Sequence, residues 1–208
     1  AMYPALLTKN PIFMDRTIKI GVINAEEAVR WGLTGPTLRG SGPAIDLRKT
    51  QPYSGYEQYD FEVPTGTHGD VYDRYLIRME EMRQSLRIVQ QALDKLPLGP
   101  VRSDDRKYVP PPRAELGTSM EAVIHHFKHW TEGFQLPAGA VYSPVESPRG
   151  ELGVYLESDG GTRPHRVHWR TPSFVHLQAL PVLARGHLVA DLVGIIGSID
   201  IVLGDSDR

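Results

Sequence analysis

One apolar stripe between Tyr72 and Leu96 constrains this chain more than any other feature of its sequence. The apolar residues recur at alternating intervals of three and four, which places them on one face of an α-helix. Asp70 stands before the run as a capping residue, with Asp73 three positions later, and Pro97 follows its end. The stripe consists of Tyr72, Tyr75, Met79, Met82, Leu86, Val89, Leu93 and Leu96.

This spacing predicts a helix of more than about seven turns, roughly twice the average length in globular proteins. A long amphipathic helix needs a partner for its apolar face. We therefore expect it to be the central member of a helix bundle.

Capping residues and apolar spacing predict four further helices. Asn24 is an N-cap candidate followed by acidic residues, and Thr118 or Ser119 caps the second strong helix. The last two helices come near the end of the chain. The predicted ranges are 24–32, 119–134, 173–186 and 187–197.

Alternating Val, Tyr and Trp residues predict three strands between the second strong helix and the last two. The ranges are 140–147, 150–159 and 165–171, and the turn sequence DGGTRP joins the last two strands. The predicted fold class is α+β and mainly helical, a bundle around the long helix with a small antiparallel sheet.

Three segments show no regular period. Gly and Pro interrupt residues 33–63, and a loop of that length usually binds something. Residues 97–113 form an internal Pro-rich connector, and residues 1–17 predict neither a strand nor a capped helix. Because Ala1 before Met2 resembles a cloning scar, we expect the chain to be a fragment of a longer protein.

Composition excludes several classes of function. The chain has 208 residues, 40% of them hydrophobic, which is enough for a packed core. Its formal charge of -2 with dispersed basic residues argues against nucleic-acid binding. Without cysteine the chain offers no disulfide, thiolate nucleophile or iron-sulfur ligand. No apolar run is long enough to span a membrane, which predicts a soluble or peripheral protein.

Two histidines on the second strong helix raise the possibility of a metal site. His125 and His129 are four residues apart and share a helix face, as a two-histidine zinc site requires. However, His126 stands where the catalytic zincin motif has a glutamate. We expect exposed or hydrogen-bonded histidines and no metal, and keep a His-based metal-dependent hydrolase as an alternative.

Charged residues crowd the other faces of the long helix. If these faces are solvated, each pair stabilises the helix by only about 0.2–0.5 kcal/mol. If the helix is packed on several sides, the same residues become buried struts or a route for charge, and the sequence leaves both interpretations open. The residues are Asp70, Asp73, Arg74, Arg78, Glu80, Glu81, Arg83 and Arg87.

Two further charged sites allow alternative interpretations. Arg149 in SPRGELG is either an ordinary turn arginine or a guanidinium held toward a cavity by Pro148 and Gly150. In the second case Asp200 could meet it in a bidentate pair. The charged C-terminal run that includes Asp200 and Asp205 is either a frayed terminus or part of that cavity. Neither a G-x-S-x-G nucleophile elbow nor a dinucleotide fingerprint is present.

Five motifs in order give the chain a resemblance to a known family. It resembles the C-terminal half of the D subunit of NADH-quinone oxidoreductase, respiratory complex I, from about Leu7 to Arg208. Residues 1–208 are therefore expected to be the C-terminal part of one larger domain of that family. The motifs are LTGPTLRGSG, DLRKTQPY, GDVYDRYLIRMEEMRQSLRIV, TSMEAVIHHFKHWTEGF and GSIDIVLGDSDR.

That family is in turn similar to the large subunit of nickel-iron hydrogenases, which implies a hydrogenase-like fold. Those enzymes close with an Asp-Pro-Cys-x-x-Cys pattern whose cysteines bind nickel, and Val202 and Asp205 stand in the cysteine positions here. Neither residue can replace a soft bridging thiolate, so the resemblance implies a cavity without its metal.

In this family the resemblance implies that the cavity is part of the quinone chamber. Arg149 and Asp200 would face it and hold a quinone carbonyl or carry the proton change that follows reduction, and Val202 and Asp205 belong to the same candidate set. The implied reaction passes electrons from NADH through flavin (FMN) and iron-sulfur clusters in partner subunits to quinone, and this chain binds no cofactor itself.

The resemblance also sets expectations for partners and location. The partners would be the other complex I subunits, especially the cluster-bearing B subunit, the C subunit and a membrane quinone-channel subunit, with the chain peripheral on the cytoplasmic side of a bacterial membrane. The histidine hairpin and the tyrosine that approach quinone in the family lie outside this chain. We therefore expect the fragment to be inactive alone and able to dimerise through its apolar stripe. A non-catalytic scaffold of a related membrane-bound hydrogenase complex is the third alternative.

Overall fold

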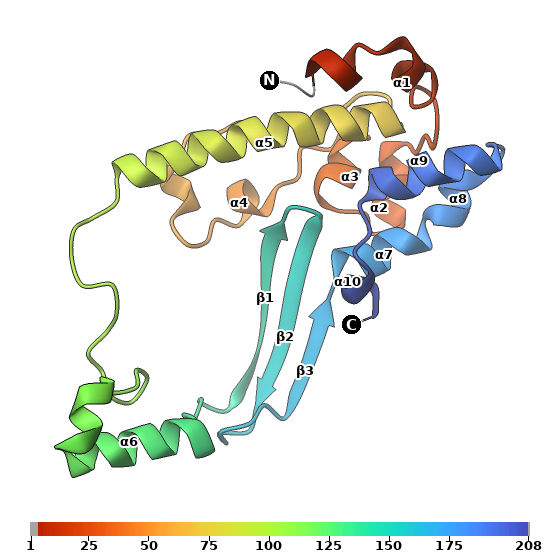
Figure 1. Ribbon diagram of the computed structural model, residues 1–208. Helices are drawn as coiled ribbons and strands as arrows, with labels where there is room; N and C mark the ends of the chain where they lie inside the picture. Colours follow the sequence, from red (N-terminus) through yellow and green to blue (C-terminus); the bar gives the residue numbers. More distant parts are fainter. Residues whose placement is uncertain (1–3, 208) are drawn as a thin grey trace. The chain divides into compact units, whose positions relative to one another are not determined.

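Helix α5 (Val71–Asp94) is the longest helix of the computed structural model, which describes residues 4–207 (Figure 1). The Asp70 side chain caps it by accepting a hydrogen bond from the Asp73 N–H at 2.8 Å. Lys95 closes the helix before Pro97, which cannot continue it. The long helix predicted from the apolar spacing is confirmed.

Short helices precede and follow α5. Before it come η1 (Pro4–Thr8), α1 (Pro11–Asp15), α2 (Ala25–Arg30), α3 (Gly35–Arg39), α4 (Leu47–Thr50) and η2 (Tyr56–Gln58). After it come η3 (Arg113–Gly117), α6 (Met120–Thr131), α7 (Pro172–Gln178), α8 (Leu180–Ala184), α9 (Val189–Ile199) and α10 (Leu203–Asp207).

The three predicted strands form one small sheet. They are β1 (Gly139–Ser147), β2 (Gly150–Ser158) and β3 (Arg166–Arg170), in the order β1-β2-β3 and with alternating directions (Figure 1). Sheet and helices together confirm the α+β class.

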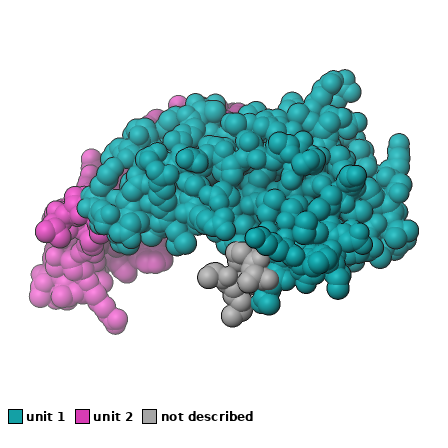
Figure 2. Space-filling view, turned by 90° about the horizontal axis from the view of Figure 1, so that it is seen from above, with its two compact units in different colours: residues 1–95, 143–153, 169–208 teal, residues 96–142, 154–168 magenta. Residues whose placement is uncertain are grey.

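The chain divides into two compact units (Figure 2). The first contains residues 1–95, 143–153 and 169–208, and the second contains residues 96–142 and 154–168. Each strand therefore contributes residues to both units.

The hydrophobic core belongs to the first unit, where α2, α3, α5, α8 and α9 bring their apolar faces together. Its most buried members include Ile195 and Ile199 from α9, which are fully inaccessible to solvent. The other core residues are Ile23, Ala28, Leu33, Leu38, Val71, Ala179 and Leu183.

Helix α5 contacts this core with a different face from the one expected. α3 and α9 pack against its first half, where Val71, Arg74 and Ile77 are buried. The second half of the predicted stripe is exposed: Met82, Leu86, Val89 and Leu93 are 52–69% accessible. Within residues 4–207, α5 is thus packed on its first half only, and the central position expected for it in a bundle is not seen for its second half.

Several boundaries differ from the sequence predictions for local reasons. The single helix expected over 173–186 is two, α7 and α8, because Pro181 has no N–H to continue the first. The irregular 33–63 segment contains α3, α4 and η2, and Asn10 caps α1 through its side chain. Asn24 caps α2 and Ser119 caps α6, as predicted.

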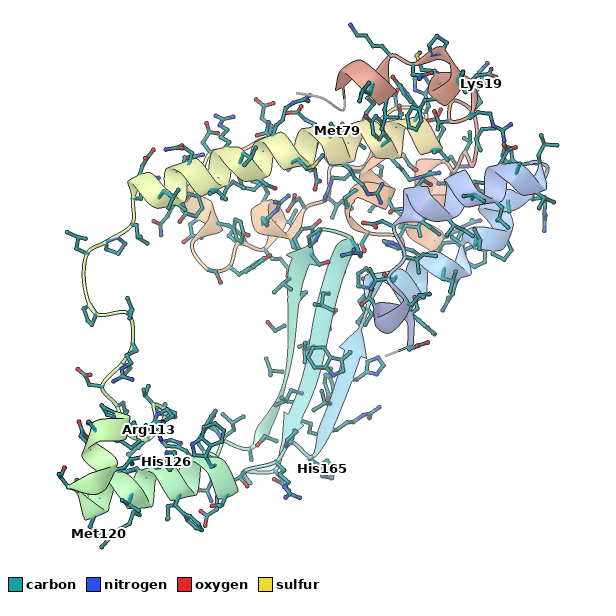
Figure 3. All side chains as sticks on the ribbon, viewed as in Figure 1. Lys19, Met79, Arg113, Met120, His126 and His165 are labelled. Carbon is teal, nitrogen blue, oxygen red and sulfur yellow. The ribbon has the colours of Figure 1, made fainter. Side chains whose placement is uncertain are left out.

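The second unit contains the connector and α6. Residues 97–112 form no regular helix or strand, and Arg106 pairs with Glu115 at 2.8 Å. His126 and Met120 lie on α6 (Figure 3). No helix in residues 4–207 is long and apolar enough to cross a membrane.

Candidate functional site

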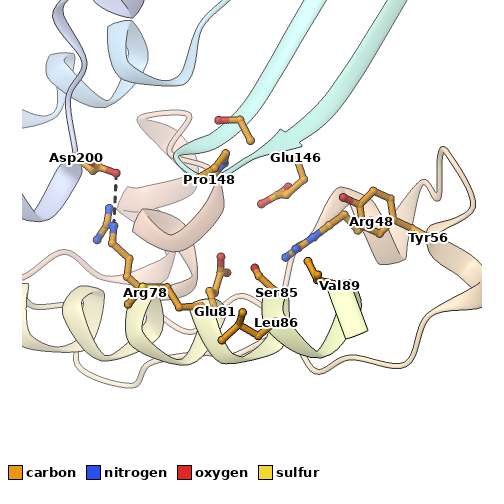
Figure 4. A pocket seen from close by; sticks show the side chains of 12 residues that line it. Arg48, Tyr56, Arg78, Glu81, Ser85, Leu86, Val89, Glu146, Pro148 and Asp200 are labelled. Atoms are coloured by element: carbon orange, nitrogen blue, oxygen red, sulfur yellow. Dashed lines mark ion pairs between the residues drawn. The ribbon is translucent and has the colours of Figure 1, made fainter. Parts of the chain in front are cut away.

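A cavity of about 800 Å³ lies in the first unit along α5 (Figure 4). The α5 residues that line it are spaced three or four positions apart, so they share one helix face. This face supplies both charged and apolar side chains. The lining residues from α5 are Arg78, Glu81, Met82, Ser85, Leu86 and Val89, and the others are Arg48, Tyr56, Glu146, Ser147, Pro148 and Asp200.

The turn between β1 and β2 is fixed against the start of α3. Gly35 and Gly150 approach so closely that a Cβ on Gly35 would lie 2.4 Å from the Gly150 Cα atom, so no side chain fits there. The Thr34 hydroxyl accepts a hydrogen bond from the Glu151 N–H at 3.0 Å. This contact fixes the turn that carries Arg149, next to the lining residues Ser147 and Pro148, whereas Arg149 itself is not among the lining residues.

Asp200 meets two arginines rather than one. Its Oδ2 atom lies 3.7 Å from Arg149 Nε and 3.9 Å from Arg78 Nε. Both distances exceed a normal hydrogen bond, so the bidentate Arg149–Asp200 pair expected from the sequence is not formed. The structure nevertheless brings the predicted pair together and adds Arg78. Burial lowers the pKa of Arg78, and the Asp200 and Glu81 carboxylates oppose that shift.

Arg39 organises a second charge cluster that the sequence patterns did not indicate. Its guanidinium is fully buried and donates to Glu146 Oε1 at 2.8 Å, to the Ile45 carbonyl oxygen at 2.9 Å and to Glu81. Beside it, Arg48 forms a bidentate pair with Asp46 at 2.9 and 2.6 Å.

The carboxylates of this cluster respond differently to burial. Burial raises the pKa of Glu146, and the Arg39 guanidinium opposes part of the rise. Burial also acts to raise the pKa of Asp46, but the hydrogen-bonded Arg48 outweighs it, so that pKa lies below its usual value. Of these two acids, Glu146 binds a proton more readily.

The charged residues of α5 divide between the two interpretations left open by the sequence. Asp70, Asp73 and Arg74 are buried near the helix start, whereas Glu80 and Arg83 pair at 2.6 Å on an exposed face. Exposed pairs of this kind contribute little to stability.

The Arg74 guanidinium is held by three neutral oxygens. It donates to the Gly69 and Gly21 carbonyl oxygens and the Ser198 hydroxyl at 2.8–3.0 Å. Burial, and then the nearby charge of Arg78, lower the pKa of Arg74 to about 10. Arg74 therefore joins α5 to α9 and to the loop before α5.

Asp73 closes the turn before α5. Burial acts to raise the pKa of Asp73, but the N–H groups of His68 and Thr67 donate to its Oδ2 at 2.6 and 2.8 Å and hold it below its usual value. Thr67–Asp70 thus leads into α5, and Asp70 caps the helix as predicted.

Val202 and Asp205 lie away from the cavity lining. Asp205 Oδ2 accepts a hydrogen bond from the Ser173 N–H at 2.9 Å, and the Val202 N–H donates to the Ser173 hydroxyl at 3.3 Å. These two candidates are therefore not among the lining residues that include Asp200, and they contact Ser173 at the start of α7.

The histidines of α6 occupy a different environment. His129 Nε2 lies 2.7 Å from the Arg106 carbonyl oxygen, and His125 lies 3.8 Å from Glu121. In residues 4–207 no group of three or more His, Asp or Glu side chains is arranged to hold a metal ion.

The missed cluster had a weak sequence signal. Arg39, Asp46 and Arg48 all fall in the irregular 33–63 segment, which was expected to bind something because of its length. Nothing in their spacing shows that Glu146, about a hundred positions later, pairs with Arg39.

Comparison with known proteins gives a consistent result. Residues 1–208 match the family described as the respiratory-chain NADH dehydrogenase 49 kDa subunit. One relative is an NADH-quinone oxidoreductase D subunit of Roseiflexus sp. (strain RS-1). It is 60% identical over 209 residues, which cover 99% of this chain and 50% of that protein.

Other relatives carry the same description. The NADH-quinone oxidoreductase D subunit of Wolbachia sp. subsp. Brugia malayi (strain TRS) is 55% identical over 98% of this chain and 52% of its own length. The D subunit of Rhodospirillum centenum is 56% identical over the same shares. The chain spans about half the length of the curated relatives it matches.

Proposed function

The chain belongs to the family of the respiratory-chain NADH dehydrogenase 49 kDa subunit, and on that basis we propose that it forms part of the quinone-reducing module of a proton-translocating NADH-quinone oxidoreductase. The observation that carries the proposal is the cavity along α5, which combines an apolar wall with Arg78, Asp200 and the neighbouring Arg149. A quinone needs both surfaces, because its tail is apolar and its carbonyl oxygens accept hydrogen bonds.

In this proposal the quinone ring lies at the charged end and the tail follows the apolar wall. Arg78 or Arg149 donates a hydrogen bond to a quinone carbonyl oxygen. Quinone takes up two electrons and two protons to become quinol. Asp200, whose side chain is 39% exposed, exchanges protons with solvent and delivers one of the two. Val202 and Asp205 remain candidates that act on the chamber through the start of α7.

The electrons come from other subunits in this proposal. NADH, FMN and the iron-sulfur clusters are bound by partner chains, and this chain supplies one wall of the quinone chamber. The partners are the other subunits of complex I, in particular the B and C subunits and a membrane quinone-channel subunit. The chain would lie on the cytoplasmic side of the bacterial membrane as a peripheral component, with a fold like that of the nickel-iron hydrogenase large subunit.

The test replaces one carboxylate in the assembled complex. Asp200→Asn keeps the side-chain size but removes the transferable proton, so we expect NADH-driven quinone reduction to slow by about tenfold or more. Reduction of ferricyanide by NADH, which bypasses the quinone chamber, should remain unchanged.

Asp207→Asn is the matched control, since Asp207 is exposed in the same C-terminal segment and does not line the cavity. It should reduce quinone at the normal rate. Equal loss of both activities in Asp200→Asn would indicate failed assembly, and unchanged quinone reduction would contradict the proposed role.

A further inference from the structure

Arg78 has an unused hydrogen-bonding edge at one end of the cavity. Its Nη1 donates to the Arg74 carbonyl oxygen at 3.2 Å, whereas its Nε and Nη2 atoms are buried and have no hydrogen-bond partner. Nε of Arg149 is buried and unpartnered as well. Buried N–H groups without an acceptor are costly, and each requires an explanation.

The same molecule shows what this edge of an arginine binds. Arg48 uses its Nε and Nη2 atoms to hold both carboxylate oxygens of Asp46, at 2.9 and 2.6 Å. This bidentate geometry matches the two oxygens of a carboxylate and is the strongest form of arginine recognition. Near the corresponding edge of Arg78, the Asp200 carboxylate lies 3.9 Å from Nε, and the Glu81 carboxylate also acts on this guanidinium.

Asp200 fills this position poorly. It lies 3.7–3.9 Å from both Nε atoms, which is beyond the distance of a normal hydrogen bond. Its side chain is 39% exposed and can turn toward solvent.

An apolar surface continues from this charged end. Met82, Leu86 and Val89 line the same cavity and are 52–69% exposed, although they are large hydrophobic side chains. A ligand that covered them would gain roughly 25 cal/mol for each Å² of apolar surface removed from water.

We propose that Arg78 and Arg149 form a subsite for a monoanionic carboxylate, the head of an amphiphile whose apolar body lies along Met82, Leu86 and Val89. The carboxylate takes the Nε–Nη2 edge of Arg78 and displaces the Asp200 side chain toward solvent. This inference concerns the cavity of the proposed function but requires no quinone reduction, because it rests on the unpaired donors and the apolar wall.

Equilibrium dialysis of labelled decanoate against the assembled, quinone-free complex tests the subsite. Decanoate should bind at least about tenfold more tightly than decanol, which lacks the charge, and than acetate, which lacks the chain. Arg78→Gln should weaken decanoate binding by about tenfold or more. Arg83→Gln is the matched control on the exposed face of the same helix and should leave binding unchanged.

Asp200→Asn distinguishes a specific subsite from a loss of binding caused by misfolding. Because the substitution removes the competing carboxylate, it should tighten decanoate binding severalfold, a gain that a misfolded variant cannot give. Equal binding of decanol and decanoate, or decanoate binding unaffected by Arg78→Gln, would overturn the subsite.

The two proposals fail in different ways. If Asp200→Asn tightens decanoate binding but leaves quinone reduction normal, the subsite stands and the proposed proton-delivery role of Asp200 fails. If decanoate does not bind while Asp200→Asn slows quinone reduction, the carboxylate subsite fails and the quinone chamber stands.

Discussion

The two charged ends of the cavity contrast in how completely their arginines are paired. Around Arg39 and Arg48, the guanidiniums donate to three carboxylates and a carbonyl oxygen at hydrogen-bond distance, and Nε of Arg39 is left without a partner. Around Arg78 and Arg149, the Asp200 carboxylate lies beyond hydrogen-bond distance. Three buried nitrogens of these two arginines have no hydrogen-bond partner among the described residues: Nε and Nη2 of Arg78 and Nε of Arg149.

This difference separates a structural cluster from a binding cluster. Well-paired buried charges fix the geometry of the elements that carry them, here α3, α4, α5 and the end of β1. Several unsatisfied donors at a cavity instead keep binding capacity for another molecule. The unpaired end also lies next to Asp200, whose left-handed backbone ends α9.

The largest expected effect lies at the paired end. Arg39→Met should lower the free energy of unfolding by about 3–5 kcal/mol, because it leaves Glu81 and Glu146 buried without their cation. Arg78→Met should cost less than half as much, since Asp200 can be solvated when its partner is lost. Denaturant unfolding of the full-length subunit measures both, and similar losses would erase the distinction between the two ends.

The second prediction uses His176, which is fully buried near the unpaired end. Its Nε2 accepts a hydrogen bond from the Thr34 N–H at 3.2 Å, which requires the neutral ring. Burial, followed by the positive charges of Arg170 and Arg78, lowers the pKa of His176 to about 4. In the unfolded chain His176 has its ordinary pKa near 6.5, so the unfolded chain takes up this proton at a higher pH than the folded chain does.

The consequence is a loss of stability on acidification. The contribution of His176 is fully present above pH 6.5 and should fall by on the order of 3 kcal/mol as the pH drops from 6.5 to 4. His176→Gln keeps an acceptor for Thr34 but does not titrate, so its unfolding free energy should fall less over that range. Denaturant unfolding of both proteins across pH gives the difference, and parallel curves would contradict the buried neutral histidine.

The smallest expected effect concerns backbone strain at Asp200. Glycine adopts the left-handed conformation without penalty, so Asp200→Gly should raise the free energy of unfolding by about 0.5–1 kcal/mol. A thermal-unfolding scan would show a higher Tm, with Asp207→Gly as the control that lacks this gain. A lower Tm for Asp200→Gly would mean that the carboxylate stabilises the arginines more than the strain costs.

Local sequence patterns predicted most elements well. The capping residues Asp70, Asn24 and Ser119 mark helix starts correctly, and alternation placed all three strands to within about one residue. Such signals depend only on neighbours within a few positions. Pro181 is a local signal of the same kind, since it marks the split between α7 and α8.

The candidate site was predicted only in part. The resemblance and the turn pattern predict Arg149 beside Asp200, and the structure sets the two side chains 3.7 Å apart without the expected bidentate pair. Arg78 was known only as one of several helix charges, and Arg39 and Glu146 were not connected. Which face of α5 is buried was predicted wrongly, because the apolar stripe shows amphipathicity but does not show which elements cover it.

By itself, the amino-acid sequence determined the long capped helix, the three strands and the family to which the chain belongs. Only the tertiary structure decided which arginines are satisfied and which are left with free donors. The physical reason is distance: helix capping and strand alternation act between near neighbours, whereas pairing of a buried charge joins residues such as Arg39 and Glu146 that only folding brings within hydrogen-bond reach.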